Sequence, residues 1–263
     1  MKKDSELIVR HFPTPPETLD IFPIADVHLG AAEHKAKEWK AFLAAISANP
    51  NAYLILSGDL INNATRSSVS NVFEETLRPM DQKRLMTEML EPLRDRILCA
   101  VPGNHEARSG KDADDDPIYD IMAKLDLEEL YRPNLAVVKI QCGDVYSNSN
   151  LNPTYTIATV HGAGGGIYTG ATVNRAERFG NVLEGADVLI TGHSHKAFMT
   201  KPGKLVINKQ KNIVTQRPYF VVGLTSWMDY GGYAMRKMLL PGSHMAQVVH
   251  LGGQRFSVSV EAA

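Results

Sequence analysis

At residues 186–195 the sequence reads ADVLITGHSH, a short apolar run that ends on a glycine and two histidines. A run of this length followed by polar residues is typical of a buried β-strand. His193 and His195 stand on either side of one serine at its carboxyl end, and such a pair can clamp a metal ion. Because a lone His-x-His pair is more often incidental than a metal site, its meaning depends on the rest of the chain.

Four other apolar runs end in the same way, on side chains that bind metals. They are LDIFPIADVH (19–28), AYLILSGDL (52–60), RILCAVPGNHE (96–106) and TYTIATVHG (154–162). The polar side chains at their ends are Asp26 and His28, Asp59, Asn104 with His105, and His161. In α/β sheets, binding sites form beyond the carboxyl ends of strands, so residues far apart in the sequence converge there. The sequence therefore predicts one site built from all of these strand ends.

The segments between these runs have the patterns of helices. Apolar residues three and four apart predict a helix over residues 33–48, and further helices are expected over 71–95 and 172–184. Pro79 and Pro92 should break or bound the second of these, and Asp116 followed by Pro117 should start another helix. Short strands are expected at residues 204–208, 212–216, 218–224, 247–251 and 255–261. This order predicts an α/β layered domain with a mixed sheet, preceded by an extended proline-rich arm at residues 11–18.

The composition bounds the class of protein and its partners. With 28 basic and 29 acidic side chains among 263 residues, the chain has no global attraction to nucleic acid or to anionic membranes. Cys99 and Cys142 are its only cysteines, which favours a reducing compartment over a disulfide framework. The sequence shows neither a signal peptide nor a membrane-spanning run, so we expect a cytoplasmic protein with no membrane partner.

The ordered blocks DVH, GD, GNHE, VHG and GHSH resemble the calcineurin-like metallophosphoesterase superfamily. The resemblance covers roughly residues 20–196 and rests on all five blocks in this order and spacing. It implies an α/β fold of two packed mixed β-sheets flanked by helices, a four-layer αββα sandwich. We expect one domain over residues 1–263, with a core at about 19–230 and strands in 231–263 that complete or extend the second sheet.

The same resemblance implies a centre of two divalent metal ions. Asp26, His28 and His195 would hold one ion, Asn104, His161 and His193 would hold the other, and Asp59 would bridge them. Imidazole and carboxylate ligands suit manganese, which we prefer, and also iron, zinc or nickel. A hydroxide activated between the ions would attack the phosphoester, and His105 would contact the phosphate or protonate the leaving oxygen.

Departures from related phosphatases favour a phosphodiester in a nucleic acid or a nucleotide. Asn62 stands where phosphoprotein phosphatases have an acid that orients the catalytic histidine, and Asn63 and Pro102 replace arginines that clamp a dianionic monoester. The motif ADVHLG also resembles nuclease subunits of DNA-repair complexes. The alternatives are a phosphomonoesterase that acts on a small metabolite or a phosphoprotein, and a non-catalytic metal-binding scaffold of the same fold.

Substrate contacts are expected in the loops at 62–80, 106–117 and 163–172. In HGAGGG, the backbone N–H groups of Gly164 and Gly165 could bind an anion, or the stretch could be a flexible loop. Lys196 and Lys201 open a basic segment that could follow a polynucleotide backbone, or could keep a hairpin soluble. Trp227 could stack a base, although packing in the core is the simpler interpretation. DNA, RNA and nucleotides are candidate substrates, and a homo-oligomer is possible.

The remaining polar features have simpler interpretations. An acidic cluster follows the Asn104 loop, and we expect it to be a solvated loop that caps a helix rather than a further metal site. Its members are Asp112, Asp114, Asp115 and Asp116. His34 lies six positions after His28 and is expected at the surface or in packing. Tyr230, like Trp227, could stack a base, although packing in the core or at a dimer contact is the simpler interpretation.

Overall fold

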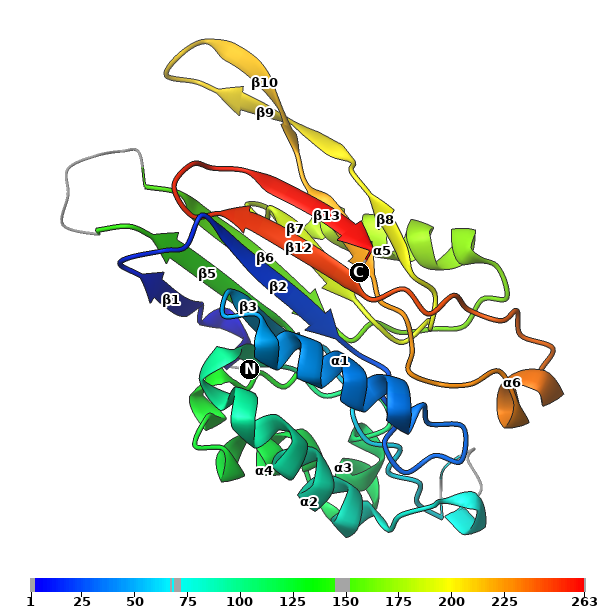
Figure 1. Cartoon of the computed structure of the whole chain (residues 1–263). Helices are drawn as coiled ribbons and strands as arrows, with labels where there is room; N and C mark the ends of the chain where they lie inside the picture. The colour runs from blue at the N-terminus through cyan, green and yellow to red at the C-terminus, as the bar shows by residue number, and fades with distance from the viewer. Residues whose placement is uncertain (1–2, 67, 69–71, 145–151, 263) are drawn as a thin grey trace.

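Two mixed β-sheets lie face to face, with helices on both outer sides (Figure 1). A computed structural model describes residues 3–66, 68, 72–144 and 152–262. The strands are β1 (Ile8–Phe12), β2 (Thr18–Ile24), β3 (Ala52–Leu56), β4 (Ile97–Ala100), β5 (Ala136–Cys142), β6 (Thr154–Val160), β7 (Val188–Thr191), β8 (Phe198–Thr200), β9 (Gly203–Asn208), β10 (Ile213–Pro218), β11 (Phe220–Gly223), β12 (Gln247–Gly252) and β13 (Val258–Ala262).

The strand order places the predicted site at one edge of each sheet. One sheet has the order β1-β5-β6-β7-β11-β8 and the other β13-β12-β2-β3-β4, while β9 and β10 form a separate hairpin. The neighbours β2, β3 and β4 run parallel, as do β6, β7 and β11. Because parallel neighbours end at the same edge, the loops after these strands are brought together.

The helices begin and end largely where the local signals place them. They are α1 (Ala36–Ala48), α2 (Pro79–Leu90), α3 (Ala107–Ala113), α4 (Pro117–Lys124), α5 (Thr169–Val182) and α6 (Gly232–Arg236), with 3-10 turns at Lys3–Ser5, Val72–Glu74, Glu91–Arg96 and Glu128–Leu130. Pro79 occupies the first turn of α2, where its missing N–H costs nothing, and Pro92 lies in the first turn of the following 3-10 segment. The Asp116 side chain accepts a hydrogen bond from the Tyr119 N–H, as expected for a helix cap.

Alternate residues of the strands divide the core into two layers. Val188 and Ile190 of β7 belong to the large apolar core, which also includes strands of the other sheet. Leu189, between them, faces the opposite side and packs in a smaller cluster with Ala176 of α5. This period of two is the one expected of strands buried on both faces. The helix α5 therefore covers the outer face of the six-stranded sheet.

The structure differs from the sequence-based expectations in three places. The first two residues of the supposed arm at 11–18 belong to the edge strand β1, which pairs in parallel with β5. Residues 107–113, expected as loop, form the helix α3. The C-terminal strands β12 and β13 extend the sheet of β2 rather than the sheet of β7, because β12 pairs antiparallel with β2. All three depend on pairing or packing partners that lie far away in the sequence.

The start of α1 differs slightly from the expected one. The first helix starts at Ala36 rather than at residue 33, because the Lys35 N–H donates to the Trp227 carbonyl and holds the preceding residues against a distant loop. Residues 67 and 69–71 of the predicted selectivity loop 62–80 lie outside the described residues, and so do the termini of the predicted domain at 1–2 and 263. Among the described residues, none of the helices has the length and apolarity that a membrane crossing requires.

Candidate metal centre

The loops that carry the predicted ligands have an unusual backbone conformation. Left-handed φ values between +48° and +69° occur at Asp26, His28, Asp59, His193 and His195. Such a conformation costs free energy in residues other than glycine, and it persists only where the surrounding structure enforces it. Here the Asp26 N–H donates to the Gly58 carbonyl and the His28 N–H to the Asp59 carbonyl, both at 3.0 Å. The loops after β2 and β3 are thus bonded to each other at the site.

Two glycines allow the loops after β3 and β4 to touch. A Cβ added to Gly58, whose φ is +86°, would lie 2.4 Å from the Gly103 nitrogen. A Cβ on Gly103 would lie 2.0 Å from Oδ1 of Asp59. A side chain at Gly103 would therefore push the Asp59 carboxylate out of place, and one at Gly58 would push the loop after β4 away.

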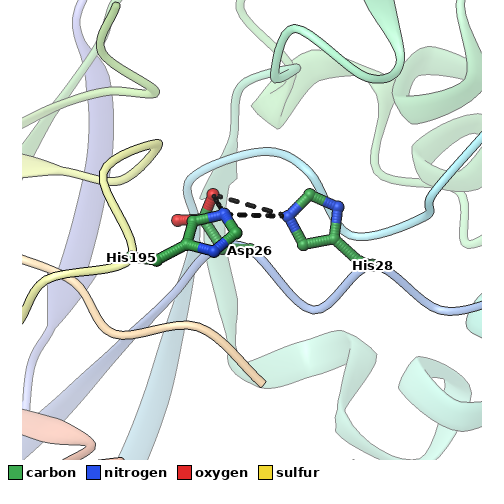
Figure 2. Close-up of side chains that lie close together, drawn as sticks. All are labelled: Asp26, His28 and His195. Carbon is green, nitrogen blue, oxygen red and sulfur yellow. Dashed lines mark hydrogen bonds and ion pairs between the residues drawn. The ribbon is translucent and has the colours of Figure 1, made fainter. Parts of the chain in front are cut away.

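Asp26, His28 and His195 form one group of converging side chains (Figure 2). Their ligand atoms all lie within 4.8 Å of one another. His28 Nε2 and His195 Nε2 are 3.1 Å apart, and Asp26 Oδ1 lies 3.3 Å from His195 Nε2. The structure therefore brings the first predicted ligand set together from two different sheets.

A second group forms around Asp59, His161 and His193, whose ligand atoms also lie within 4.8 Å of one another. The Asn104 Oδ1 is 2.6 Å from His193 Nδ1 and 3.1 Å from His161 Nε2. Asp59 Oδ2 lies 3.2 Å from His161 Nε2 and 4.0 Å from His28 Nε2. Asp59 therefore stands between the two groups, at the place where the resemblance puts a bridging carboxylate.

The donor atoms fit divalent cations in both their number and their direction. Asp26 Oδ1 is buried without a hydrogen-bond partner among the described residues. The His161 Nδ1–H donates to the Ser57 carbonyl at 2.8 Å, which turns Nε2 toward Asn104 and Asp59. Lone pairs of nitrogen and oxygen thus meet at common points, an arrangement that repels itself unless a cation or protons lie between them. Metal-binding histidines are commonly oriented through their other nitrogen in this way.

The charges at the centre leave some ligands free of protons and hold a proton on others before a cation binds. Burial holds the pKa of His28 well below its ordinary value, so its imidazole stays neutral. Burial alone would raise the pKa of Asp59, but His161 and His105 lower it well below the usual range. For His161, burial is outweighed by the Asp59 carboxylate, and the pKa rises to about 10. A cation at this position would therefore displace a proton from His161.

His105 lies beside both groups and forms, with His28 and Asp59, a third set of donor atoms that lie within 4.8 Å of one another. Its Nδ1–H donates to the Asn62 backbone carbonyl at 2.9 Å, so Nε2 faces the centre, 3.8 Å from Asp59 Oδ2. The Asn62 side chain instead donates to Glu75. Asn62 does orient His105, but through its backbone carbonyl and not through its side chain, as the comparison with the orienting acid had suggested. Burial lowers the pKa of His105, while Asp59 opposes this.

Glu106 is a positioning residue that the sequence reasoning missed. Its buried carboxylate accepts hydrogen bonds from the N–H groups of Gly103, Asp59 and Ile61, at 2.8, 2.9 and 3.1 Å. Burial and the nearby Asp59 charge raise its pKa to about 7. Its place at the end of the GNHE block, directly after Asn104 and His105, was the signal in the sequence that could have pointed to this role. It holds the loops after β3 and β4 together from below the ligands.

The predicted substrate contacts do not all gather at the centre. The carbonyls of Gly164 and Gly165 accept hydrogen bonds from Arg175, at 3.1 and 3.2 Å, so this loop is tethered by a cation. Lys196 donates to the carbonyls of Gly166 and Ile167 in the same loop. Lys201 instead lies 4.4 Å over the Phe220 ring and lines a separate cavity of about 470 Å³. The basic segment continues onto the β9–β10 hairpin, which projects from the body of the molecule (Figure 1).

The remaining candidates have structural roles. Trp227 packs against Trp39 and Phe42, with ring centroids 5.2 and 4.6 Å away. Tyr230 is partly exposed, and its hydroxyl donates to the Leu239 carbonyl. The His34 Nδ1–H donates to the Val27 carbonyl at 2.8 Å. In the acidic cluster, Asp115 pairs with Lys83, Asp114 ends α3 in a left-handed conformation, and Asp116 caps α4.

A cleft of about 650 Å³ opens beside the second ligand group. Asn104, His161 and His193 line it on one side, and residues of α5 line it on another. The size is that of a pocket for a small organic molecule.

Two mixed sheets with clustered histidines and aspartates at their edge define a metal-binding α/β protein. The family of calcineurin-like phosphoesterases matches residues 20–197, and the chain belongs to this family. Its members' fold explains the two helix-covered sheets, and the His and Asp groups indicate divalent metal binding.

Two solved structures resemble the chain at low sequence identity. A metallophosphoesterase from Sphaerobacter thermophilus is 17% identical, with a TM-score of 0.42, over 93% of this chain and 88% of that one. A conserved uncharacterized protein from Streptococcus pneumoniae TIGR4, described as a predicted phosphoesterase, is 11% identical, with a TM-score of 0.33, over 94% and 98%. A search of curated proteins gives no match.

Proposed function

We propose that the chain is a phosphodiesterase that uses two divalent metal ions, preferably manganese, and acts on a nucleic acid or a nucleotide. The observation that carries this proposal is the pair of ligand groups with Asp59 between them, 3.2 Å from His161 and 4.0 Å from His28, and with His105 beside them. Asp26, His28 and His195 would hold one ion, and Asn104, His161 and His193 the other. A nuclease is the preferred form of this activity.

The chain's own residues supply orientation and proton handling. When bound, two divalent ions supply Lewis acidity to the phosphoryl oxygens and to a water nucleophile. In hydrolysis, the attacking water loses one proton as its oxygen forms a bond to phosphorus, the bond to the leaving oxygen breaks, and that oxygen takes up a proton. With Nδ1–H held by the Asn62 carbonyl, His105 Nε2 is the atom that contacts the phosphate or gives this proton.

A phosphodiester is preferred because the residues at the two arginine positions have other roles. The Asn63 side chain donates to the His105 carbonyl at 2.9 Å and is buried, and Pro102 lines the cleft. A monoesterase remains the second candidate on one observation. Arg108 Nη1 lies 3.4 Å from the Asn62 carbonyl, so a guanidinium from a different position stands close to His105.

Turnover of two small esters separates these candidates. With added Mn²⁺, we expect faster hydrolysis of bis-p-nitrophenyl phosphate than of p-nitrophenyl phosphate, and none of either after EDTA treatment. Greater turnover of the monoester would overturn the diester preference, and activity that survives complete metal removal would overturn the metal mechanism. A screen across single-stranded DNA, duplex DNA, RNA and cyclic dinucleotides would then identify the substrate class.

A His105→Ala variant tests the non-catalytic scaffold. We expect a loss of about 10²–10⁴ in kcat, the range for general acid–base groups, with Mn²⁺ binding retained. His11→Ala, in the edge strand β1, is the matched control and should keep wild-type kcat. An unchanged kcat in His105→Ala would remove this residue from the reaction.

We also infer a reducing compartment such as the cytoplasm. Cys99 and Cys142 are both buried and unpaired in the structure. Cell fractionation of a tagged chain tests this inference. Recovery of the chain from an oxidising compartment would contradict it.

A further inference from the structure

The cleft beside the second ligand group has one wall made by a single face of α5. Thr172, Arg175, Ala176, Phe179 and Val182 line it at spacings of three and four, as residues on one side of a helix do. Phe179 is half-buried, and Val182 is 74% exposed. His161 and His193 also line the cleft, so a molecule that fills this space would touch both α5 and the second ligand group.

The charge of the cleft is positive and is not neutralised by the chain. Arg175 and Arg178 both line it, and none of the described residues that line it is an aspartate or a glutamate. Arg175 donates to backbone carbonyls of the glycine loop rather than to a carboxylate. Arg178 is exposed and has no hydrogen bond or ion pair with any of the described residues. A guanidinium left without an acidic partner is suited to bind a phosphate.

The apolar part of the cleft fits a ring. The Phe179 side chain, Val182 and Pro133 give flat or aliphatic surface next to the arginines. Aromatic side chains and guanidinium groups are the usual surfaces on which nucleobases stack. The volume of about 650 Å³ is in the range of sites that enclose one small organic molecule.

We propose that this cleft binds the nucleoside of the substrate, and that Arg178 binds a second phosphate carried by that nucleoside. This inference rests on the proposed phosphodiesterase function. It places the scissile phosphate at the ligand groups and the nucleoside esterified to that phosphate in the cleft. The preferred substrate is then a nucleoside with two phosphates, one of them the scissile diester. Such units occur within a nucleic acid strand and among free nucleotides.

Binding to the metal-free protein tests the cleft without any reaction. In EDTA, calorimetry should show that thymidine 3′,5′-bisphosphate binds about tenfold more tightly than thymidine 5′-monophosphate, as expected for one charge-assisted contact at a partly exposed site. The Arg178→Ala variant should bind both compounds with equal affinity. Arg255→Ala removes the same charge in the turn between β12 and β13 and should keep the tenfold difference. The proposal would be overturned if the wild type bound the two compounds with equal affinity. It would also be overturned if the tenfold difference in affinity survived in Arg178→Ala or disappeared in Arg255→Ala.

Hydrolysis provides the second readout. The p-nitrophenyl ester of thymidine 5′-phosphate can be made with a 3′-hydroxyl or with a 3′-phosphate. We expect kcat/KM about tenfold higher for the 3′-phosphate in the wild type and no such ratio in Arg178→Ala. A DNA oligonucleotide and free thymidine 3′,5′-bisphosphate, used as competing inhibitors, would show which of the two sources binds more tightly.

Failure of this inference can be told apart from failure of the proposed function. If bis-p-nitrophenyl phosphate is not hydrolysed, the phosphodiesterase proposal fails, whereas the calorimetric difference and its loss in Arg178→Ala still support a phosphate site in the cleft. If the diester is hydrolysed and the second phosphate changes neither binding nor kcat/KM, the cleft assignment alone is overturned.

Discussion

The loops after β2 and β3 differ from the loop after β7, although all three carry predicted ligands. The side chains of Asp26, His28 and Asp59 are at most 3% exposed, whereas the His195 side chain is 38% exposed. The first two loops are bonded to each other and lie beneath the site, while the β7 loop borders the cleft. The comparison indicates a buried half that fixes the ligand geometry and an open half that admits the substrate.

The buried half depends on Asp59 more than on any other single side chain. An Asp59→Asn variant keeps the shape and an oxygen that can accept from the His105 N–H, but it removes the charge between the two ligand groups. Loss of a residue that only orients a ligand costs 10–100-fold in metal affinity, so we expect a loss of at least about 100-fold in Mn²⁺ affinity by calorimetry. Asp95→Asn, fully on the surface, is the control. Wild-type Mn²⁺ affinity in Asp59→Asn would contradict a bridging role.

Glu106 is expected to hold the buried half together even without metal. Glu106→Gln replaces one acceptor oxygen with an NH₂ group that faces backbone N–H donors, so the variant should lose about 2 kcal/mol of unfolding free energy. Urea denaturation in EDTA at pH 8 measures this, with the exposed Glu184→Gln as the control. Equal stability of the two variants would show that the loops after β3 and β4 do not need the carboxylate.

The open half should show the backbone strain most directly. At His195, where φ is +56°, both Gly and Ala remove the imidazole, but only Gly accepts the left-handed conformation without a Cβ penalty. His195→Gly should therefore exceed His195→Ala in unfolding free energy by about 0.5–1 kcal/mol in metal-free protein. Both should bind Mn²⁺ weakly. A more stable alanine variant would mean that the loop relaxes and stores no strain.

The smallest effect is expected at the two cysteines, Cys99 in β4 of one sheet and Cys142 in β5 of the other. Burial raises the pKa of the Cys99 thiol to about 12 and that of Cys142 to about 11, so both are protonated at pH 8 and unreactive. Iodoacetamide should label neither in the native protein and both in urea, as measured by mass spectrometry. Labelling of one cysteine at native conditions would show that its side of the molecule opens more readily.

Much of the site could be predicted from local sequence because each ligand follows its own apolar strand. The blocks at Asp26, Asp59, Asn104, His161 and His193 were readable one by one, and parallel strands must bring their ends to one edge. The atom that orients His105 could not be read in this way, because a backbone carbonyl has no residue signature. The role of Glu106 was hidden for a related reason, since its partners are three backbone N–H groups.

The sequence by itself determined most of the succession of strands and helices, the helix starts at Pro79 and Asp116, and the candidate metal-binding side chains, because these depend on short-range patterns. Only the tertiary structure decided that residues 8–12 become an edge strand, that β12 pairs with β2, and that α5 faces the second ligand group across a cleft. These features arise from contacts between segments far apart in the chain, where many pairings satisfy the same local pattern and packing selects one.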